Sequence, residues 1–160
     1  MLFGRQRWDR PPTEPAGVLL ASAGGPFSGA AVRRAYELAA GQPVAVLTIL
    51  KVYGSSFGLP NPGLLPTRRE REEQYAIVRR AIAAVERRGG TADGQIAATR
   101  SAGRTIAKVA RRRQVRYVVM DDSVPSGMRR VTEGSVTAIV RRRLGEQTTL
   151  ELVGPGARIS

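Results

Sequence analysis

The sequence contains no cysteine and no histidine among its 160 residues. Without cysteine, disulfides, thiolate catalysis and most structural zinc sites are excluded. Without histidine, the Ser-His and Cys-His nucleophile pairs and a common metal ligand are excluded as well. Any catalysis would have to use carboxylates, lysine, tyrosine or bound phosphates, so we expect a protein that is not an enzyme.

Long apolar runs and aromatic residues are also scarce. No apolar run approaches the roughly 18 residues of a membrane-spanning helix, and the first 15 residues lack the apolar centre of a secretion signal. Aromatic residues make up 5% of the chain, and only Tyr117 lies near the arginine triplets at 111–113 and 141–143. Base-stacking surfaces are therefore missing. We expect a cytoplasmic protein without membrane insertion and without nucleic acid as its partner.

Positive charge is abundant and unevenly distributed. The formal net charge is +13, and only Lys51 and Lys108 among the 26 basic residues are lysines. Between Arg100 and Arg143 there are twelve basic residues against three acids. The triplets stand near the ends of predicted helices, where cations complement the helix dipole. Two interpretations remain open: solvated helix faces, or a field that attracts phosphates, nucleic acid or an anionic membrane.

Short apolar runs alternate with segments of helical periodicity along the chain. Ser28 is a predicted helix cap, and Thr67 with Glu70 forms a predicted capping box. The pattern predicts strands at 17–22, 43–50, 95–99, 115–120 and 148–153, and helices at 29–40, 67–88, 101–113 and 135–143. Such alternation predicts the α/β class: an open, mostly parallel, Rossmann-like five-stranded sheet with helices on both faces. Ligands of such sheets bind at the carboxyl ends of the strands.

The chain divides into one domain and two terminal segments. Residues 1–16 are rich in basic residues and proline and are predicted to be a flexible arm. Residues 17–154 form the predicted domain, and residues 155–160 are a tail.

The order and spacing of these elements from Gly17 to Val153 resemble the universal stress protein family. The strongest local similarity is Val118-Val-Met120 followed by Glu133-Gly134-Ser135-Val136. The resemblance implies a homodimer formed through the last strand, which begins at Thr148 and ends at Val153. Its alternation of polar and apolar residues suits a half-exposed sheet edge.

Family members that bind ATP carry a loop of the form Gly-x2-Gly-x9-Gly-Ser or Gly-x2-Gly-x9-Gly-Thr after the fourth strand. Glycine lets backbone N–H groups approach the phosphates closely. Here the first two glycine positions hold Asp121 and Val124, while Gly134 and Ser135 keep the third. The family's adenine-contacting aspartate corresponds to Ala23. The resemblance therefore implies a degenerate ATP-binding loop.

The resemblance also gives the positions of a residual nucleotide pocket. They are Ala21, Ala23, Val52, Met120, Asp121, Gly127, Gly134, Ser135 and Val136. Arg104, Arg129 and Arg130 are candidates for phosphate contacts, because guanidinium groups bind phosphate bidentately.

Each of these positions has a structural alternative. Met120 and Val52 suit an apolar core, and Gly134 with Ser135 suits the start of the last helix. Paired carboxylates at the end of a strand can hold magnesium, so Asp121 and Asp122 form a weak candidate site. Otherwise they are solvated or pair with Arg129 or Arg130.

Three functions follow from these observations. The first is a non-enzymatic stress-response protein that acts through dimerisation and protein contacts and binds ATP weakly or not at all. The alternative is a protein that binds an adenine nucleotide or another phosphorylated metabolite through the Gly-Ser helix start and arginines. The third is a binder of nucleic acid or an acidic partner, driven by charge. Neither a dinucleotide fingerprint nor a P-loop is present.

Overall fold

The computed structural model shows a five-stranded sheet with four helices and describes residues 11–52, 66–122 and 128–154, with only the helix backbone described from 128 to 135. The strand order is β3-β2-β1-β4-β5, and all neighbours are parallel. This confirms the predicted α/β fold. The elements are β1 (Val18–Ser22), α2 (Gly29–Ala39), β2 (Val44–Lys51), α3 (Arg68–Arg87), β3 (Ala92–Thr99), α4 (Ala102–Arg112), β4 (Tyr117–Asp121), α5 (Met128–Arg143) and β5 (Thr149–Val153).

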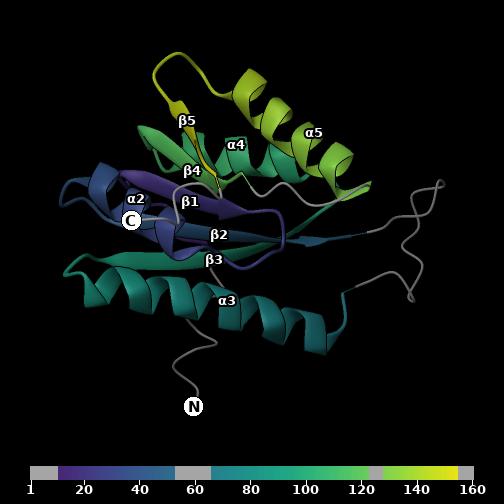
Figure 1. Ribbon diagram of the computed structural model, residues 1–160, viewed down its shortest axis with the longest axis horizontal. Helices are drawn as coiled ribbons and strands as arrows, with labels where there is room; N and C mark the ends of the chain where they lie inside the picture. Colours follow the sequence, from purple (N-terminus) through teal and green to yellow (C-terminus); the bar gives the residue numbers. More distant parts are fainter. Residues whose placement is uncertain (1–10, 53–65, 123–127, 155–160) are drawn as a thin grey trace.

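The helices form two layers, one on each face of the sheet. In Figure 1, α4 and α5 lie above the sheet and α3 lies below it. One core contains Leu19 and Leu47 of the sheet with Ile106 and Val140 of α4 and α5. The opposite core joins the other side chains of the strands to α2 and α3. Alternate residues of a strand point to opposite faces, so both faces of a continuously apolar strand are buried.

The central strand β1 lies at the point where the strand order reverses. It pairs with β2 on one side, with Val18 opposite Val44, and with β4 on the other, with Val18 opposite Tyr117. The carboxyl ends of β1 and β4 therefore diverge towards helices on different faces. In open parallel sheets this is where a ligand crevice forms.

Two helix starts illustrate what local sequence does and does not predict. The capping box of α3 is confirmed: Thr67 accepts from the Glu70 N–H, and the Glu70 carboxylate accepts from the Thr67 N–H at 2.7 Å. The predicted start of the last helix at Ser135 is wrong, because α5 begins at Met128. Residues 128–133 contain neither proline nor glycine, and one glycine inside a helix costs only about 1 kcal/mol.

The strand β3 is longer than predicted. The periodicity predicts residues 95–99, whereas β3 begins at Ala92. Asp93 and Gly94 are poor strand formers, yet they lie in register with Ala45 and Val46 of β2. Pairing with a buried neighbour therefore extends the strand, since strand propensity depends on context.

Part of the predicted arm is attached to the domain. Ala16 is buried, and its N–H donates to the Arg113 carbonyl at 2.9 Å. The Arg113 Nε also donates to the Glu14 carbonyl. Residues 1–10, which make up most of this arm, and the tail at 155–160 lie outside the described residues. No helix in the described ranges is long and apolar enough to cross a membrane.

Candidate functional site

The predicted nucleotide positions converge on the carboxyl ends of β1 and β4. Five of them line one pocket of about 80 Å³ together with residues of the loop after β1. The predicted members of this lining are Ala21, Ala23, Met120, Asp121 and Val136. We call this cavity the strand-end pocket. Ala21 and Met120 are buried, whereas Ala23 is exposed at the rim.

The remaining predicted positions lie elsewhere. Val52 does not line the strand-end pocket, and its N–H donates to the Thr99 carbonyl at 3.0 Å. Arg104 lines a larger neighbouring cavity beside α4. Gly127 is outside the described residues. The backbone of Arg129, Arg130, Gly134 and Ser135 belongs to α5. The side chains of the two arginines and of Ser135 are outside the described part.

The position of Gly134 and Ser135 inside α5 changes what their backbone can do. A helix end presents free N–H groups to a phosphate, whereas interior N–H groups are bonded to the carbonyl four residues earlier. Since α5 begins at Met128, both residues follow its first turn. Gly134 and Ser135 therefore do not offer the free backbone N–H groups of a helix start, and their contact with phosphate stays a prediction.

The carboxylate of Asp121 is held by Ser28. The Ser28 N–H donates to Asp121 Oδ2 at 2.9 Å, and the Ser28 hydroxyl donates to Oδ1. The same hydroxyl accepts from the Ala31 N–H at 3.0 Å and thereby caps α2. A negative charge at a helix N-terminus is favourable because of the helix dipole. The Asp121 carboxylate thus supplies a negative charge next to the N-terminus of α2.

The described contacts of the Asp121 carboxylate add a partner that the sequence did not suggest, because both come from Ser28. Pairing with Arg129 or Arg130 stays a prediction, since the side chains of these arginines lie outside the described residues. Asp122 is exposed, and its N–H donates to the Val153 carbonyl at 2.8 Å. Across the described ranges, no three carboxylates gather into a group that suits a metal ion.

The loop between β1 and α2 is shaped by contacts that the sequence analysis missed. Gly24 has a φ of +119°, a conformation that favours glycine. Its carbonyl accepts from the Gln74 amide of α3 at 2.9 Å. Ser22 donates to the Gly25 carbonyl at 2.5 Å. Gln74 lies 50 residues away in sequence, so local patterns contain no signal for this contact.

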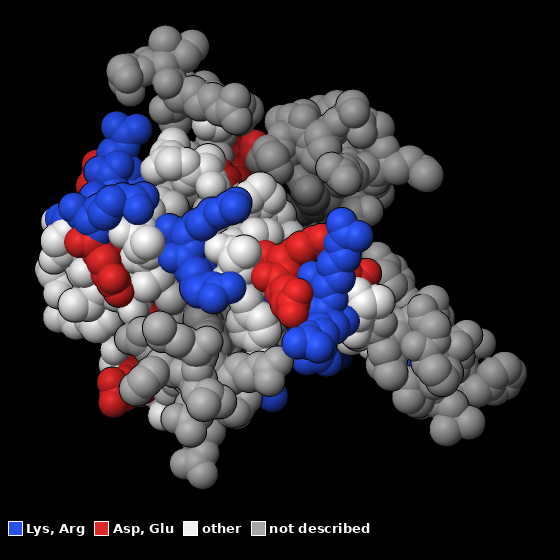
Figure 2. Space-filling view, turned by 90° about the horizontal axis from the view of Figure 1, so that it is seen from below, with Lys and Arg blue, Asp and Glu red and all other residues white. Residues whose placement is uncertain are grey.

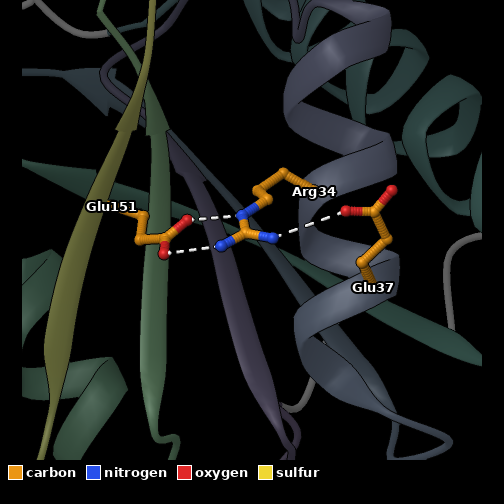
Figure 3. A network of polar contacts seen from close by, with 3 residues as sticks. All are labelled: Arg34, Glu37 and Glu151. Atoms are coloured by element: carbon orange, nitrogen blue, oxygen red, sulfur yellow. Dashed lines mark hydrogen bonds and ion pairs between the residues drawn. The ribbon is translucent and has the colours of Figure 1, made fainter.

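The second polar feature is the outer strand β5, which is joined to α2 by an ion pair (Figure 3). Arg34 donates to both carboxylate oxygens of Glu151, at 2.6 Å and 2.9 Å, and contacts Glu37 at 3.5 Å. The hydrogen bonds from Arg34 hold the pKa of Glu151 below its ordinary value, although partial burial acts in the opposite direction. The carboxylate of Glu151 in turn raises the pKa of Arg34.

The open edge of β5 can be read from its pairing with β4. Thr149 donates to the Arg116 carbonyl, and the Val153 carbonyl accepts from Asp122. Alternate residues of a parallel ladder bond to the same neighbour. Thr149, Glu151 and Val153 therefore face β4 through their backbone, while the N–H and C=O groups of Leu150 and Leu152 point to the open side. No strand pairs with that side in the part of the chain that the structure describes.

Comparisons with known proteins agree with this architecture. A model described as the universal stress protein family matches residues 17–144. A search among curated proteins found no match. A universal stress protein from Archaeoglobus fulgidus is similar in structure, with a TM-score of 0.63 and 16% identity over 86% of this chain and 97% of that chain.

Two further solved structures share the fold. A protein of the same family from Burkholderia pseudomallei has a TM-score of 0.62 and 20% identity over 89% of this chain and 98% of that chain. A universal stress protein in complex with cAMP has a TM-score of 0.59 and 21% identity over 88% of this chain and 98% of that chain. At these identities the likeness establishes the fold alone.

Proposed function

The chain belongs to the universal stress protein family, and we propose that it is a cytoplasmic, non-enzymatic stress-response protein that acts through dimerisation and protein contacts. In this proposal it binds ATP weakly or not at all at the family's nucleotide position. The observation that carries the proposal is the Asp121 carboxylate at the strand-end pocket, bonded to Ser28.

The negative charge of Asp121 disfavours a nucleotide in the strand-end pocket. Phosphate groups beside the carboxylate would be repelled, and like charges a few ångströms apart cost on the order of 1 to 4 kcal/mol in a partly solvated site. Asp121 cannot turn away without breaking two contacts to the start of α2. A phosphate ligand would therefore have to overcome either the repulsion or, if Asp121 turned away, the loss of its two hydrogen bonds from Ser28.

The small volume of the strand-end pocket also disfavours a nucleotide. Pockets for small molecules usually measure about 300 to 1,000 Å³. The strand-end pocket has about 80 Å³, and Met120 and Val136 close its buried side. Gly134 lies inside α5, where an interior N–H is bonded within the helix and is not free for a phosphate. These observations support weak or absent ATP binding.

Dimerisation is proposed through β5. The backbone groups of Leu150 and Leu152 that point to the open side need partners, and an exposed strand edge is a template for pairing. A second copy related by a twofold axis would supply the same groups in return. The Arg34–Glu151 ion pair joins β5 to α2 and helps to hold this edge strand in place.

A second candidate function is binding of an adenine nucleotide or another phosphorylated metabolite. It is favoured by one comparison, since a structurally similar universal stress protein is known in complex with cAMP. In this chain the phosphates would need side chains such as Arg104 in place of backbone N–H groups.

Calorimetric titration distinguishes the two candidates. ATP, ADP, AMP and cAMP are titrated into the protein with and without Mg²⁺. We expect no adenine-dependent binding tighter than about 1 mM, an affinity that corresponds to only about 4 kcal/mol. Micromolar binding that requires the adenosine portion would overturn the proposal and establish the nucleotide-binding alternative.

A further inference from the structure

A large cationic cavity lies beside the strand-end pocket, between α4 and α5. It measures about 810 Å³ and shares Val136 with its smaller neighbour. Its walls come from the end of β2, the residues that join β3 to α4, and the second half of α5. We call it the interhelical pocket. Its basic residues are Lys51, Arg100, Arg104, Arg142 and Arg143.

These five cations lack carboxylate partners in the described part of the chain. The described ion pairs involve other arginines, such as Arg68 with Glu72 at 3.2 Å and Arg69 with Glu73 at 3.5 Å on α3. Viewed from the side on which α3 lies in Figure 1, basic and acidic side chains are adjacent (Figure 2). Two arginines at the start of α3 are therefore neutralised by neighbouring carboxylates, whereas the described charged residues that line the interhelical pocket are all basic. Like charges so arranged repel one another, and a bound anion would relieve that repulsion.

The start of α4 adds polar donors to the same cavity. Ser101, Ala102, Gly103 and Arg104 all line it. The Thr105 N–H donates to the Ser101 carbonyl, which is the first hydrogen bond of the helix. The Ser101 side chain makes no capping bond. The N–H groups of the first turn thus receive no help from the cap residue. They are donors of the kind that phosphate accepts at helix starts.

Gly103 sets the floor of the cavity. A Cβ at this position would lie 2.7 Å from Ile139 Cγ2 and 3.1 Å from the Val136 carbonyl. Only glycine lets α4 and α5 approach this closely without rearrangement. Arg104 of α4 and Arg142 of α5 both line this cavity and are exposed.

We propose that the interhelical pocket binds a small phosphate-rich anion, either inorganic polyphosphate of a few units or the polyphosphate group of a metabolite. Several guanidinium groups in one concavity match a chain of phosphates, because each can form bidentate charged hydrogen bonds. The cavity volume falls in the range of small-molecule sites. The site uses arginine side chains and does not depend on the family's glycine loop.

The lining disfavours nucleic acid as the occupant. Single strands are held by aromatic side chains on which the bases stack. Among the described residues that line the interhelical pocket, none is aromatic. Nucleic acid is nevertheless an outcome that the test must separate from a small anion.

The test is calorimetric titration of the full chain with sodium tripolyphosphate at low salt, without Mg²⁺. Two variants remove pocket charge: Arg100→Gln/Arg104→Gln and Arg142→Gln/Arg143→Gln. The matched control, Arg71→Gln/Arg79→Gln, removes the same charge from exposed positions of α3. All six arginines are exposed, so the variants should fold, and circular dichroism verifies this.

We expect saturable binding by the parent protein, weakened about tenfold or more in each pocket variant and less than about twofold in the control. Raising the salt from about 20 mM to about 200 mM should weaken it further. Equal weakening in the control, or no saturable binding at low salt, overturns the proposal. If a single-stranded oligonucleotide binds more tightly than tripolyphosphate and this binding is lost in the same pocket variants, the ligand of the pocket is nucleic acid and the proposal of a small anion is wrong.

A comparison of tripolyphosphate, ATP and AMP separates this inference from the proposed function. One outcome is that ATP binds as tightly as tripolyphosphate, with the binding of both ligands lost in Arg100→Gln/Arg104→Gln. In that case the interhelical pocket recognises the phosphate groups, and the proposed function stands. Adenosine-dependent binding that survives these substitutions contradicts the proposed function alone. Tripolyphosphate binding that survives them contradicts the inference alone.

Discussion

Arg113, directly after α4, forms a two-pronged ion pair with Asp93 of β3, with N–O distances of 2.8 Å and 2.6 Å. The arginine side chain is 2% exposed, and its Nε also donates to the Glu14 carbonyl. One buried guanidinium therefore joins the end of α4, an outer strand and the segment that leads into β1. Removing a partner from a buried pair leaves an uncompensated charge.

The first prediction concerns this ion pair. We expect Arg113→Gln to lower the free energy of unfolding by about 3 kcal/mol, because Asp93 loses its partner and the Glu14 carbonyl loses a donor. Arg112→Gln is the control, since Arg112 is exposed and should change stability by less than about 0.5 kcal/mol. Urea unfolding measures both. Equal effects would mean that the buried pair contributes nothing beyond ordinary helix-end charge.

The second prediction concerns Asp121 and the start of α2. We expect Asp121→Ala to cost about 2 kcal/mol, because the Ser28 N–H and hydroxyl lose their acceptor. Asp122→Ala removes the same charge from an exposed neighbour and should cost less than about 0.5 kcal/mol. A double-mutant cycle with Ser28→Ala should show a coupling of at least about 0.5 kcal/mol. Additive losses would show that the two side chains act independently.

The third prediction concerns pH and the Arg34–Glu151 pair. The folded-state pKa of Glu151 lies below its ordinary value of 4.5 because Arg34 favours the ionised carboxylate. Its contribution to stability is therefore present above pH 4.5 and is lost as the pH falls through the folded-state pKa. Glu151→Gln should cost about 0.5 to 1 kcal/mol near neutral pH, since the Arg34 side chain is 43% exposed and solvent screens the pair.

Unfolding measured across pH checks this prediction. The stability difference between the parent protein and Glu151→Gln should shrink towards zero in acid. Glu37→Gln provides the comparison, because Glu37 contacts the same arginine at the longer distance of 3.5 Å and is 52% exposed. It should have a smaller effect at every pH. A Glu151→Gln difference that does not change with pH would contradict the assigned interaction.

The fourth prediction tests the proposed dimer through individual amides. In the monomer, the N–H groups of Leu150 and Leu152 point to the open side of β5, whereas those of Glu151 and Val153 point to β4. Hydrogen exchange at Leu150 and Leu152 should slow as protein concentration rises, because a second strand then accepts from them. Exchange at Glu151 and Val153 should respond much less.

The dimer prediction has a clear negative outcome. Light scattering that shows a dimer, together with unchanged exchange at Leu150 and Leu152, would place the interface elsewhere. Concentration-dependent protection at the opposite edge strand β3 would identify that strand as the interface.

Much of the fold could be predicted from local patterns. The segments that form β1, β2 and β4 are continuously apolar, which is typical of strands buried on both faces. Their alternation with helices is compatible with few other topologies. The caps at Ser28 and Thr67 were also predictable, because each depends on contacts within three residues. The start of α5 was not predictable from the Gly-Ser pair, since helix propensity is informative only when it is summed over a window of about 15 residues.

The sequence by itself determined the class of fold and the family, because periodicity and residue type are local properties. The roles of identical residues were decided only by the tertiary structure. Arg111, Arg112 and Arg113 are equivalent in sequence, yet Arg113 alone is buried against Asp93, 20 residues away. Asp121 likewise became the anion of α2 because folding brings it to Ser28, 93 residues away. Contacts across such separations depend on how strands and helices pack, and no short segment encodes them.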